Sequence, residues 1–320
     1  MLHIHDHTIA SLLDLSSVTD VVAAAFMAWG HGRADSTQRV RSSAAGGMAS
    51  AMAAVVPPYS GGKVYATKNG VFTFVNVLFD LDGQFLCTLD GDALTRFRTP
   101  AACAIAIQAL AAPNSTRAAL VGAGRQGWYH LEMLAAELTL ECVTICDLRP
   151  EAAEAMAERA RAAGIPAITA ATPTDAVAGA DVVVTVTQAT EPLFGADAIG
   201  DRTLICAVGA TKYDRCEIGA DVVERCAAVI CDDTVGSQVE CGDLIRAAAS
   251  GQFHWDRAIE LRDLMAGNVA VPRAGDRPVL FETQGVALQD VATAGLVYER
   301  LAAEQRSSGL TAGPTAGGNF

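Results

Sequence analysis

Residues 119–127 are Ala-Leu-Val-Gly-Ala-Gly-Arg-Gln-Gly, a GxGxxG pattern that follows an apolar run and opens a helical segment. In this setting Gly122 permits a tight turn, Gly124 lets a pyrophosphate approach the backbone, and Gly127 permits close packing of the helix on the strand. The helix N-terminus adds free N–H groups and the positive end of the helix dipole. The stretch therefore predicts a Rossmann domain that binds a dinucleotide.

The carboxylate of Asp147 is expected to select the dinucleotide. Asp147 ends the next β-forming run, 20 residues after Gly127, where an acid accepts hydrogen bonds from the ribose hydroxyls and repels a 2′-phosphate. NAD is therefore favoured over NADP, although Arg149 could hold a 2′-phosphate if it turned inward. Further cofactor contacts are expected from Thr99, Arg125, Gln126, Thr187, Val208 and Thr283.

The chain after residue 113 alternates short apolar runs with helical segments, which is typical of a doubly wound parallel sheet. The expected strands are 118–121, 143–146, 167–171, 181–187, 203–208 and 227–232, with 279–281 as a candidate last strand. A long helix is expected over 285–303. This region is therefore the α/β part of the fold.

The first 112 residues show a different pattern. A helix is expected over 16–30, with Ser16 or Ser17 as its cap, and another over 92–111. Between them lie five runs rich in β-forming residues, separated by turn signals that include Asn69-Gly70 and Asp82-Gly83; the runs are 37–43, 48–55, 63–68, 71–80 and 84–89. Such runs predict an antiparallel sheet in an α+β domain.

Three parts of the chain follow from these patterns. We expect an N-terminal α+β domain at 1–112, joined by the C-terminal helix 285–306, and a Rossmann domain at 113–284. The tail 307–320, rich in Gly, Ser and Thr, is expected to be disordered.

Composition limits the function. A net charge of −13 argues against binding to nucleic acid or to anionic membranes. No apolar run reaches the roughly 20 residues of a membrane span, and Met1–His7 does not resemble a signal peptide, so a cytoplasmic protein is expected. Its expected partners are small molecules and further copies of itself.

Metal binding is not expected. The nine cysteines form no CxxC pair and no zinc-type spacing, so we interpret them as reduced. His3, His5 and His7 alternate and could form a metal clip, but a solvated N-terminal strand explains their spacing equally well.

Several segments together resemble the ornithine cyclodeaminase/mu-crystallin family and occur in its order: Gly62–Val64, Leu94–Thr99, Gly122–Gly127, Val208–Ala210, Glu240–Leu244 and Leu280–Asp290. The resemblance implies an N-terminal antiparallel domain that dimerises and supplies the substrate pocket, with the nicotinamide between it and the Rossmann domain. Members include cyclodeaminases, alanine dehydrogenases and ketimine reductases. All of them move hydride between nicotinamide C4 and the α-carbon of an amino or imino acid.

The family pattern places Arg39, Lys63 and Arg98 on the cationic positions that hold the substrate carboxylate. A guanidinium can bind a carboxylate in a bidentate manner, and a lysine beside it can also deliver a proton. Lys63 and Arg98 are therefore the expected catalytic residues. Arg41 competes with Arg39 for its role, and both arginines could instead be solvated strand residues, just as Arg98 could cap a packing contact.

One position departs from the cyclodeaminase pattern. Thr211 stands two residues after Gly209, where cyclodeaminases carry a catalytic aspartate. Threonine has no useful pKa near neutrality, whereas ring closure with loss of amine needs a base. Reduction of a preformed imine needs only a held carboxylate, an aligned hydride and a proton source. The sequence therefore favours an NADH-dependent imine reductase that converts a small α-imino acid to an α-amino acid.

The substrate side chain is suggested by the remaining cations. Only three of the 23 cationic residues are lysines, namely Lys63, Lys68 and Lys212. Lys212 beside Thr211, together with Arg39, Arg41, Lys63 and Lys68, gives more positive charge than one carboxylate requires. We therefore expect a dicarboxylate such as iminosuccinate, which would yield aspartate. The alternatives are an alanine-type dehydrogenase, a cyclic ketimine reductase, and a non-catalytic protein that binds NAD(P)H and a small ligand.

Overall fold

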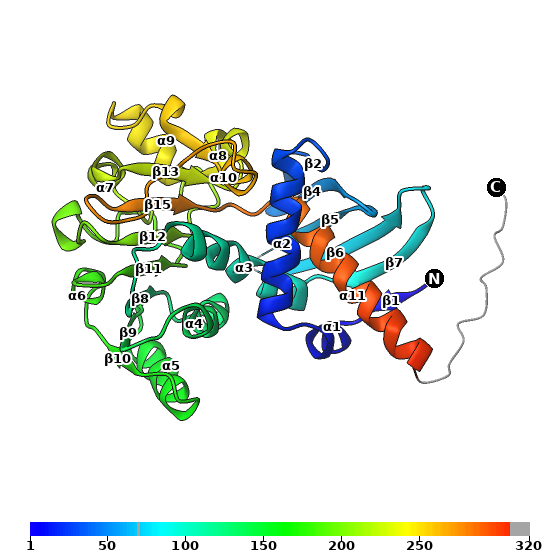
Figure 1. Cartoon of the computed structure of the whole chain (residues 1–320), viewed down its shortest axis with the longest axis horizontal. Helices are drawn as coiled ribbons and strands as arrows, with labels where there is room; N and C mark the ends of the chain where they lie inside the picture. The colour runs from blue at the N-terminus through cyan, green and yellow to red at the C-terminus, as the bar shows by residue number, and fades with distance from the viewer. Residues whose placement is uncertain (69–70, 308–320) are drawn as a thin grey trace.

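Two β-sheets organise the chain in the computed structural model, which describes residues 1–68 and 71–307 (Figure 1). Over these residues the second sheet has eight strands, all parallel, in the order β10-β9-β8-β11-β12-β15-β13-β14. Their bounds are β8 Arg117–Val121, β9 Cys142–Cys146, β10 Ala167–Thr169, β11 Val182–Thr185, β12 Leu204–Ala207, β13 Ala228–Cys231, β14 Ala258–Glu260 and β15 Val279–Glu282. The predicted doubly wound Rossmann sheet is confirmed.

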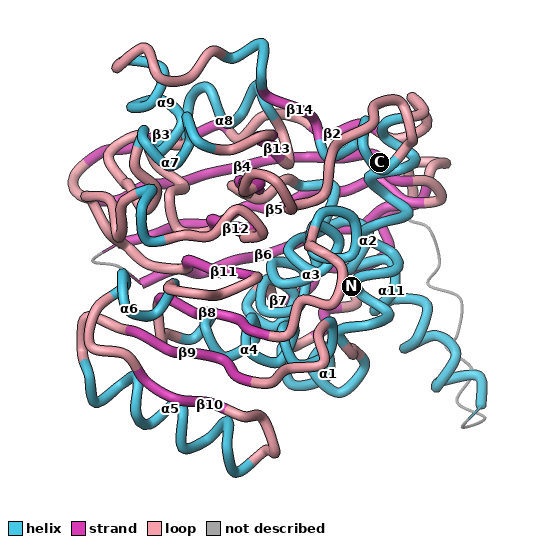
Figure 2. The backbone as a smooth tube through the Cα atoms, turned by 60° about the vertical axis from the view of Figure 1, so that its left-hand side comes forward, coloured by secondary structure: helices cyan, strands magenta, loops and turns pink. Residues whose placement is uncertain are grey.

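Burial explains why these runs form parallel strands. Every residue of β11, β12, β13 and β15 is buried, as expected where helices cover both faces of a sheet. The covering helices are α4 Arg125–Glu137, α5 Pro150–Ala162, α6 Pro173–Val177, α7 Ala220–Arg225, α8 Thr234–Glu240, α9 Gly242–Ala249 and α10 Leu261–Met265, with 3₁₀ turns at Ala196–Ala198 and Trp255–Arg257. α5 lies along β9 and β10 at one edge of the sheet (Figure 2). β14 was not predicted.

The N-terminal sheet is antiparallel apart from one edge. Its order is β1-β7-β6-β5-β4-β2, with β3 also paired to β4, and only β1 runs parallel to its neighbour. The bounds are β1 His3–Ile4, β2 Asp35–Ser36, β3 Val40–Ala44, β4 Gly47–Val56, β5 Tyr59–Lys68, β6 Val71–Asp80 and β7 Phe85–Asp90. The predicted meander is therefore confirmed, and the turn at Gly83 has the left-handed φ of +83° that glycine permits. The predicted turn at Asn69-Gly70 lies outside the described residues.

Helices cover one face of the N-terminal sheet. They are α1 Asp6–Leu12, α2 Leu15–Gly30, α3 Asp92–Leu110 and α11 Ala287–Ser307. α11 packs against β4, β5 and α2, and α2 and α11 lie side by side in Figure 1. On the opposite face of the sheet, alternate residues such as Ala53 and Val64 are exposed.

Three local predictions need correction. α2 is capped by Asp14, whose Oδ1 accepts a hydrogen bond from the Ser17 backbone at 2.8 Å, so Ser16 and Ser17 are not the cap. α1 was not predicted, because its seven residues span only two turns. Ser307 is the last residue of α11 and not the start of a tail; the rest of the predicted disordered tail, 308–320, lies outside the described residues.

α3 connects the two sheets. It contacts α1 and α2 on one side and α4 and β12 on the other, and it lies between the sheets in Figure 1. Its alanines permit this close packing, since Ala101, Ala102, Ala104 and Ala106 are fully buried. One hydrophobic cluster therefore runs from Phe26 of α2 to Leu120 of β8.

The described residues contain no single helix with the length and hydropathy of a membrane span. Only α1 and α2 taken together pass such a test, and they meet at 90°.

Candidate active site at the junction of the two sheets

The glycine-rich loop has the geometry that a pyrophosphate requires. Gly122 has a φ of +114°, and a side chain there would place Cβ 2.7 Å from the carbonyl oxygen of Val186. A Cβ at Gly127 would clash with the carbonyl of Gly122, whereas a Cβ at Gly124 would project into open space. Two glycines therefore permit the tight turn and the helix packing, and the third leaves room for a ligand at the N-terminus of α4.

Asp147 is held beside this loop. Its Oδ2 accepts a hydrogen bond from the Ala123 backbone at 2.7 Å, and its Oδ1 accepts one from the Arg149 backbone at 2.9 Å. Each carboxylate oxygen keeps a free lone pair for a ribose hydroxyl. The Arg149 side chain is 66% exposed, with Nε 3.5 Å from Asp147 Oδ1. The residues present therefore fit a dinucleotide.

The other expected cofactor residues lie near the same edge of the sheet. Thr187, Val208 and Thr283 come just after β11, β12 and β15, where ligands of such sheets bind. Arg125 is exposed and pairs with Asp92 at 2.7 Å. Gln126 faces α3, where its amide reaches the Thr95 carbonyl at 3.4 Å, and Thr99 belongs to α3, where its hydroxyl donates to the same carbonyl at 2.8 Å.

Lys63 and Arg98 meet in a buried cluster built from three elements. Lys63 Nζ of β5 lies 3.0 Å from Asp290 Oδ1 of α11 and 2.7 Å from the Thr95 hydroxyl of α3. Arg98 Nη1 donates to Gln289 Oε1 at 2.8 Å, and its Nε lies 3.4 Å from Asp290 Oδ1. The two cations that were expected to act together therefore share one buried carboxylate.

Burial changes the acidity of Lys63. Its side chain is 1% exposed, and this burial lowers its pKa to about 8, although the Asp290 carboxylate opposes the change. A lysine with a pKa near 8 carries a proton at neutral pH and can release it readily. The cluster can therefore hold an anion and supply a proton.

Several polar atoms around this cluster lack partners. Within the described chain, Arg39 Nε, Arg98 Nε and Gln289 Nε2 are buried without a hydrogen-bond partner, as is Asp290 Oδ2. Buried polar groups are normally paired, so unpaired donors at a cluster of cations point to a missing ligand or water. Three of the four atoms are donors, which suits a carboxylate.

Arg39 is largely engaged by the protein. Its Nη1 lies 2.5 Å from Glu240 Oε2, and its Nη2 donates to the carbonyls of Gln284 and Gly285 at 2.9 and 2.7 Å. Arg41 pairs with the other oxygen of Glu240 at 2.8 Å. Glu240 therefore pairs with both arginines, and Nε is the Arg39 donor without a partner among the described residues.

Thr211 and Lys212 lie in a separate cleft of about 750 Å³ between the two sheets. Its lining includes Met48, Thr67, Lys68, Phe72, Gly209 and Arg215. No acceptor among residues 1–68 and 71–307 lies within hydrogen-bond distance of the Lys212 ammonium. The structure thus brings Lys68 and Lys212 to one cleft, and Arg39, Lys63 and Arg98 to a separate buried cluster.

Sequence reasoning missed a buried glutamate at the sheet edge. Glu217 accepts hydrogen bonds from the backbones of Thr187 and Gly209, at 2.5 and 2.6 Å, and from the Thr185 hydroxyl at 2.9 Å. It therefore fixes the ends of β11 and β12 relative to each other. Asp290, Gln289 and Glu240 were also missed as site residues, although buried cations in a protein core signal that buried acids must accompany them.

Several curated relatives of this chain are named as reductases of imino acids. Δ¹-Pyrroline-2-carboxylate reductase 2 from Burkholderia ambifaria is 35% identical over 225 residues, which cover 70% of this chain and 68% of the relative. Iminosuccinate reductase from Paracoccus denitrificans is 33% identical over 225 residues, covering 69% and 68%.

Solved structures share the whole fold. A probable ornithine cyclodeaminase from Bordetella pertussis is 38% identical with a TM-score of 0.90, covering 96% of this chain and 98% of that chain. The Thermococcus litoralis Δ¹-pyrroline-2-carboxylate reductase, in complex with NADH and L-proline, is 25% identical with a TM-score of 0.89, covering 95% and 98%. The model of the ornithine cyclodeaminase/mu-crystallin family matches residues 2–305. The chain therefore belongs to the ornithine cyclodeaminase/mu-crystallin family.

Proposed function

We propose that this protein is an NADH-dependent imine reductase that converts a small α-imino acid to an α-amino acid. As a member of its family it is an oxidoreductase that acts on C=N or CH–NH₂ groups with a nicotinamide cofactor. The observation that carries the proposal is the buried cluster of Lys63, Arg98 and Asp290 beside the carboxyl edge of the parallel sheet. Its unpaired donors suit a substrate carboxylate, and its lysine suits a proton donor.

The chain's own groups account for cofactor binding. The backbone around Gly124 would hold the pyrophosphate, and Asp147 would accept the ribose hydroxyls. When bound, NADH supplies the hydride that adds to the imine carbon. Because Asp147 lies at the ribose position and the Arg149 side chain is mostly exposed, we expect NADH to be preferred over NADPH.

Lys63 and Arg98 then complete the reaction. Arg98 fixes the α-carboxylate and thereby orients the C=N bond, which is worth much of the rate in reactions of this kind. Lys63 donates the proton that the nitrogen needs as the carbon is reduced, and its lowered pKa of about 8 makes that transfer easy. Asp290 and Thr95 hold the ammonium in place.

Thr211 argues against cyclodeamination. One similar structure is that of a probable ornithine cyclodeaminase, but the position at which cyclodeaminases carry a catalytic aspartate is occupied here by Thr211. A hydroxyl cannot take the α-ammonium proton at neutral pH. We therefore expect reduction of imines and no release of ammonia from ornithine.

We infer that the substrate is a dicarboxylate. Lys68 and Lys212 line one cleft, so a second carboxylate that entered it would find a cationic partner there. Iminosuccinate, which gives aspartate, fits this arrangement, and an iminosuccinate reductase is among the relatives. A cyclic ketimine is the second candidate, because pyrroline-2-carboxylate reductases are relatives too and Met48 and Phe72 make part of the cleft apolar.

NADH oxidation tests these alternatives directly. The protein is assayed with iminosuccinate, formed from oxaloacetate and ammonia, with iminopropionate, formed from pyruvate and ammonia, and with Δ¹-pyrroline-2-carboxylate. We expect the highest kcat/KM for iminosuccinate. A preference for the cyclic ketimine would select the second candidate, and tight NADH binding without turnover of any imine would show a non-catalytic binding protein.

We also propose a homodimer formed by the open face of the N-terminal sheet. This face exposes Val55, Val64 and Val75, and a shallow apolar groove of about 720 Å³ runs along it. Such a patch on a sheet marks an interface, and a second copy offers a matching surface. We expect light scattering to give the mass of a dimer, and Val64→Glu to give a monomer. Val239→Glu, at an exposed valine of α8, is the matched control.

A further inference from the structure

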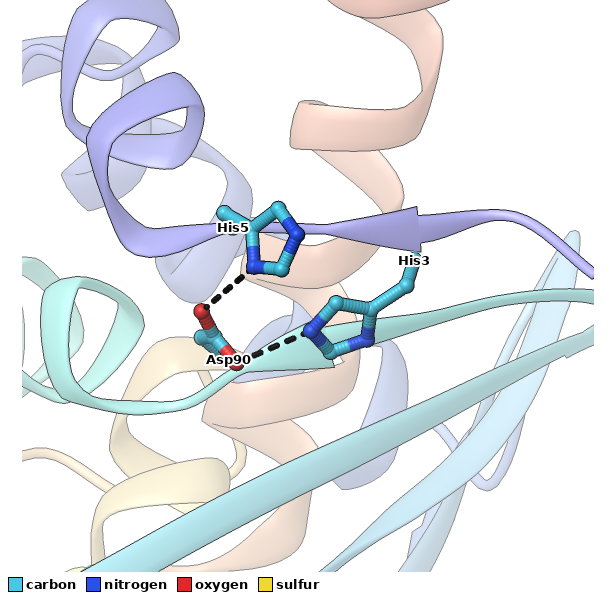
Figure 3. Close-up of side chains that lie close together, drawn as sticks. All are labelled: His3, His5 and Asp90. Carbon is cyan, nitrogen blue, oxygen red and sulfur yellow. Dashed lines mark hydrogen bonds and ion pairs between the residues drawn. The ribbon is translucent and has the colours of Figure 1, made fainter.

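The N-terminal strand brings two histidines and an aspartate together at the edge of the first sheet (Figure 3). His3 and His5 lie on the same side of the chain because alternate residues of an extended strand share a face. Ile4 between them points the other way and is 2% exposed. β1 pairs in parallel with β7, with His3 opposite Thr88 and Ile4 opposite Leu89. The same register places Asp90 beside His5.

The spacing of the three side chains suits one metal ion. His3 Nε2 lies 3.0 Å from Asp90 Oδ1, and His5 Nδ1 lies 3.3 Å from Asp90 Oδ2. One ligand atom from each of the three residues falls within a group no wider than 4.8 Å. Two ligands that each lie about 2.0–2.2 Å from a zinc ion are roughly 3–3.5 Å apart. Only small side-chain rotations are therefore needed to place all three around one ion.

The outer hydrogen bonds also resemble those of a metal site. The other ring nitrogen of His3, Nδ1, lies 2.8 Å from the Thr88 hydroxyl, which leaves Nε2 free to bind a metal. Asp90 Oδ2 accepts a hydrogen bond from the Asp6 backbone at 3.1 Å. Metal-binding histidines usually make such a bond through their second nitrogen, and ligating carboxylates are held in the same way.

We propose that His3, His5 and Asp90 bind one divalent cation of the zinc, cobalt and nickel group. Two imidazoles and one carboxylate suit these ions better than magnesium or calcium, which prefer oxygen ligands. The side chains of His3 and His5 are 36% and 61% exposed, so water can complete the coordination. The bound ion links β1 to the end of β7. The sequence suggested only a metal site of His3, His5 and His7. In the structure, the third candidate ligand beside His3 and His5 is Asp90.

Zinc binding to the full-length, untagged protein tests the proposal. Binding is measured by calorimetry with Zn²⁺, and Co²⁺ is used as a spectroscopic probe because its visible absorption reports nitrogen and oxygen ligands. We expect one ion per chain. His3→Ala, His5→Ala and Asp90→Asn should each weaken binding at least tenfold, and Thr88→Val should weaken it about tenfold through the lost hydrogen bond.

Two matched histidine variants serve as controls. His7→Ala removes a ring that stacks on His5 at 6.0 Å, and His254→Ala removes an exposed histidine far along the chain; both should bind zinc as the unmodified protein does. Zinc should raise the Tm of the unmodified protein and leave that of Asp90→Asn unchanged, and each variant's own Tm without metal shows whether it folds.

Three results would overturn the proposal. The first is an unmodified protein that binds no zinc at about 1 mM free ion. The second is unchanged affinity in a folded Asp90→Asn or His5→Ala variant, which would mean that zinc binds elsewhere or through His3 alone. The third is equal loss in His7→Ala, which would assign the ion to a simple histidine cluster.

Discussion

Lys63 and Asp290 form a buried ion pair that joins the antiparallel sheet to the C-terminal helix. Nζ and Oδ1 are 3.0 Å apart, and each side chain is 1% exposed. The cation comes from the domain that was expected to hold the substrate, while the anion reaches it from a helix that follows the last strand of the Rossmann sheet. The pair therefore ties the end of the chain to the candidate active site.

Removing one partner of this pair should be strongly destabilising. Asp290→Leu leaves the charges of Lys63 and Arg98 buried without the counter-ion that they share, and removal of one partner of a buried pair costs about 3–5 kcal/mol. The double variant Lys63→Met/Asp290→Leu should be closer in stability to the unmodified protein than the Asp290→Leu single variant. Urea unfolding measures both. A double variant that loses the sum of the two single losses would show that the residues do not act as a pair.

The pH dependence of imine reduction should report Lys63. Its pKa is lowered from 10.5 to about 8, so the protonated donor is present below pH 8 and is lost as the pH rises through that value. kcat/KM should therefore fall above about pH 8. Lys63→Arg keeps the charge but cannot release a proton in this range. The variant should therefore have a lower kcat, and its kcat/KM should no longer fall above about pH 8. If kcat/KM of Lys63→Arg still falls above about pH 8, the decrease is caused by deprotonation of the substrate imine.

The nucleotide preference should depend on Asp147. We expect kcat/KM to favour NADH over NADPH by at least about tenfold, which corresponds to roughly 1.4 kcal/mol. Asp147→Ser removes the charge that repels a 2′-phosphate and should reduce the ratio. Arg149→Ala is the companion variant, since an exposed guanidinium that plays no part in NADH binding can be removed without loss. Equal use of both nucleotides by the unmodified protein would contradict the role of Asp147.

Much of the fold could be predicted because its signals are local. The glycine loop sits within nine residues, and runs such as Val182–Thr185 and Leu204–Ala207 are apolar throughout, as buried parallel strands must be. β1, β2, β14 and α1 were missed, whereas β10, which is as short as β14, lies within the longer predicted run 167–171. Their formation depends on neighbours that lie far away in the sequence.

The cations of the site could be predicted from the sequence, but the acids that pair with them could not, because those acids lie far away in the sequence. Lys63 and Arg98 lie in segments that resemble the family pattern, whereas no such pattern identified the acids that pair with the cationic side chains. Asp290 is 227 residues from Lys63, and Glu240 is 201 residues from Arg39. No local pattern specifies such pairs. The packing of α8 and α11 against the N-terminal strands leaves Arg39 and Arg98 each with bonded guanidinium nitrogens and an Nε without a hydrogen-bond partner in the described part of the chain.

Stability should fall as pH rises through the range of the buried acids. Burial raises the pKa of Asp243 from 3.8 to about 7, and burial beside Asp243 raises that of Glu282 as well. The protonated acid is favoured in the folded state, so its contribution is fully present below about pH 4 and is lost as the pH rises to about 7. The free energy of unfolding in urea, measured across this range, should therefore decrease less steeply with pH in Asp243→Asn. An identical slope in the variant would show that Asp243 is ionised when folded.

Lys212 decides the substrate class. Its side chain lines the cleft that also contains Lys68 and Thr211, and we propose that it binds the second carboxylate of iminosuccinate. Lys212→Ala should therefore lower kcat/KM for iminosuccinate by about tenfold or more, because a charge-assisted hydrogen bond is worth roughly 1.5–3 kcal/mol. The same variant should turn over iminopropionate nearly as well as the unmodified protein, since that substrate has no second carboxylate.

The companion variant Lys68→Ala, in the same cleft, shows whether the second carboxylate has one cationic partner or two. Equal losses for both substrates would mean that Lys212 supports the cofactor or the fold. Faster turnover of iminopropionate than of iminosuccinate by the unmodified protein would leave imine reduction standing and rule out the dicarboxylate.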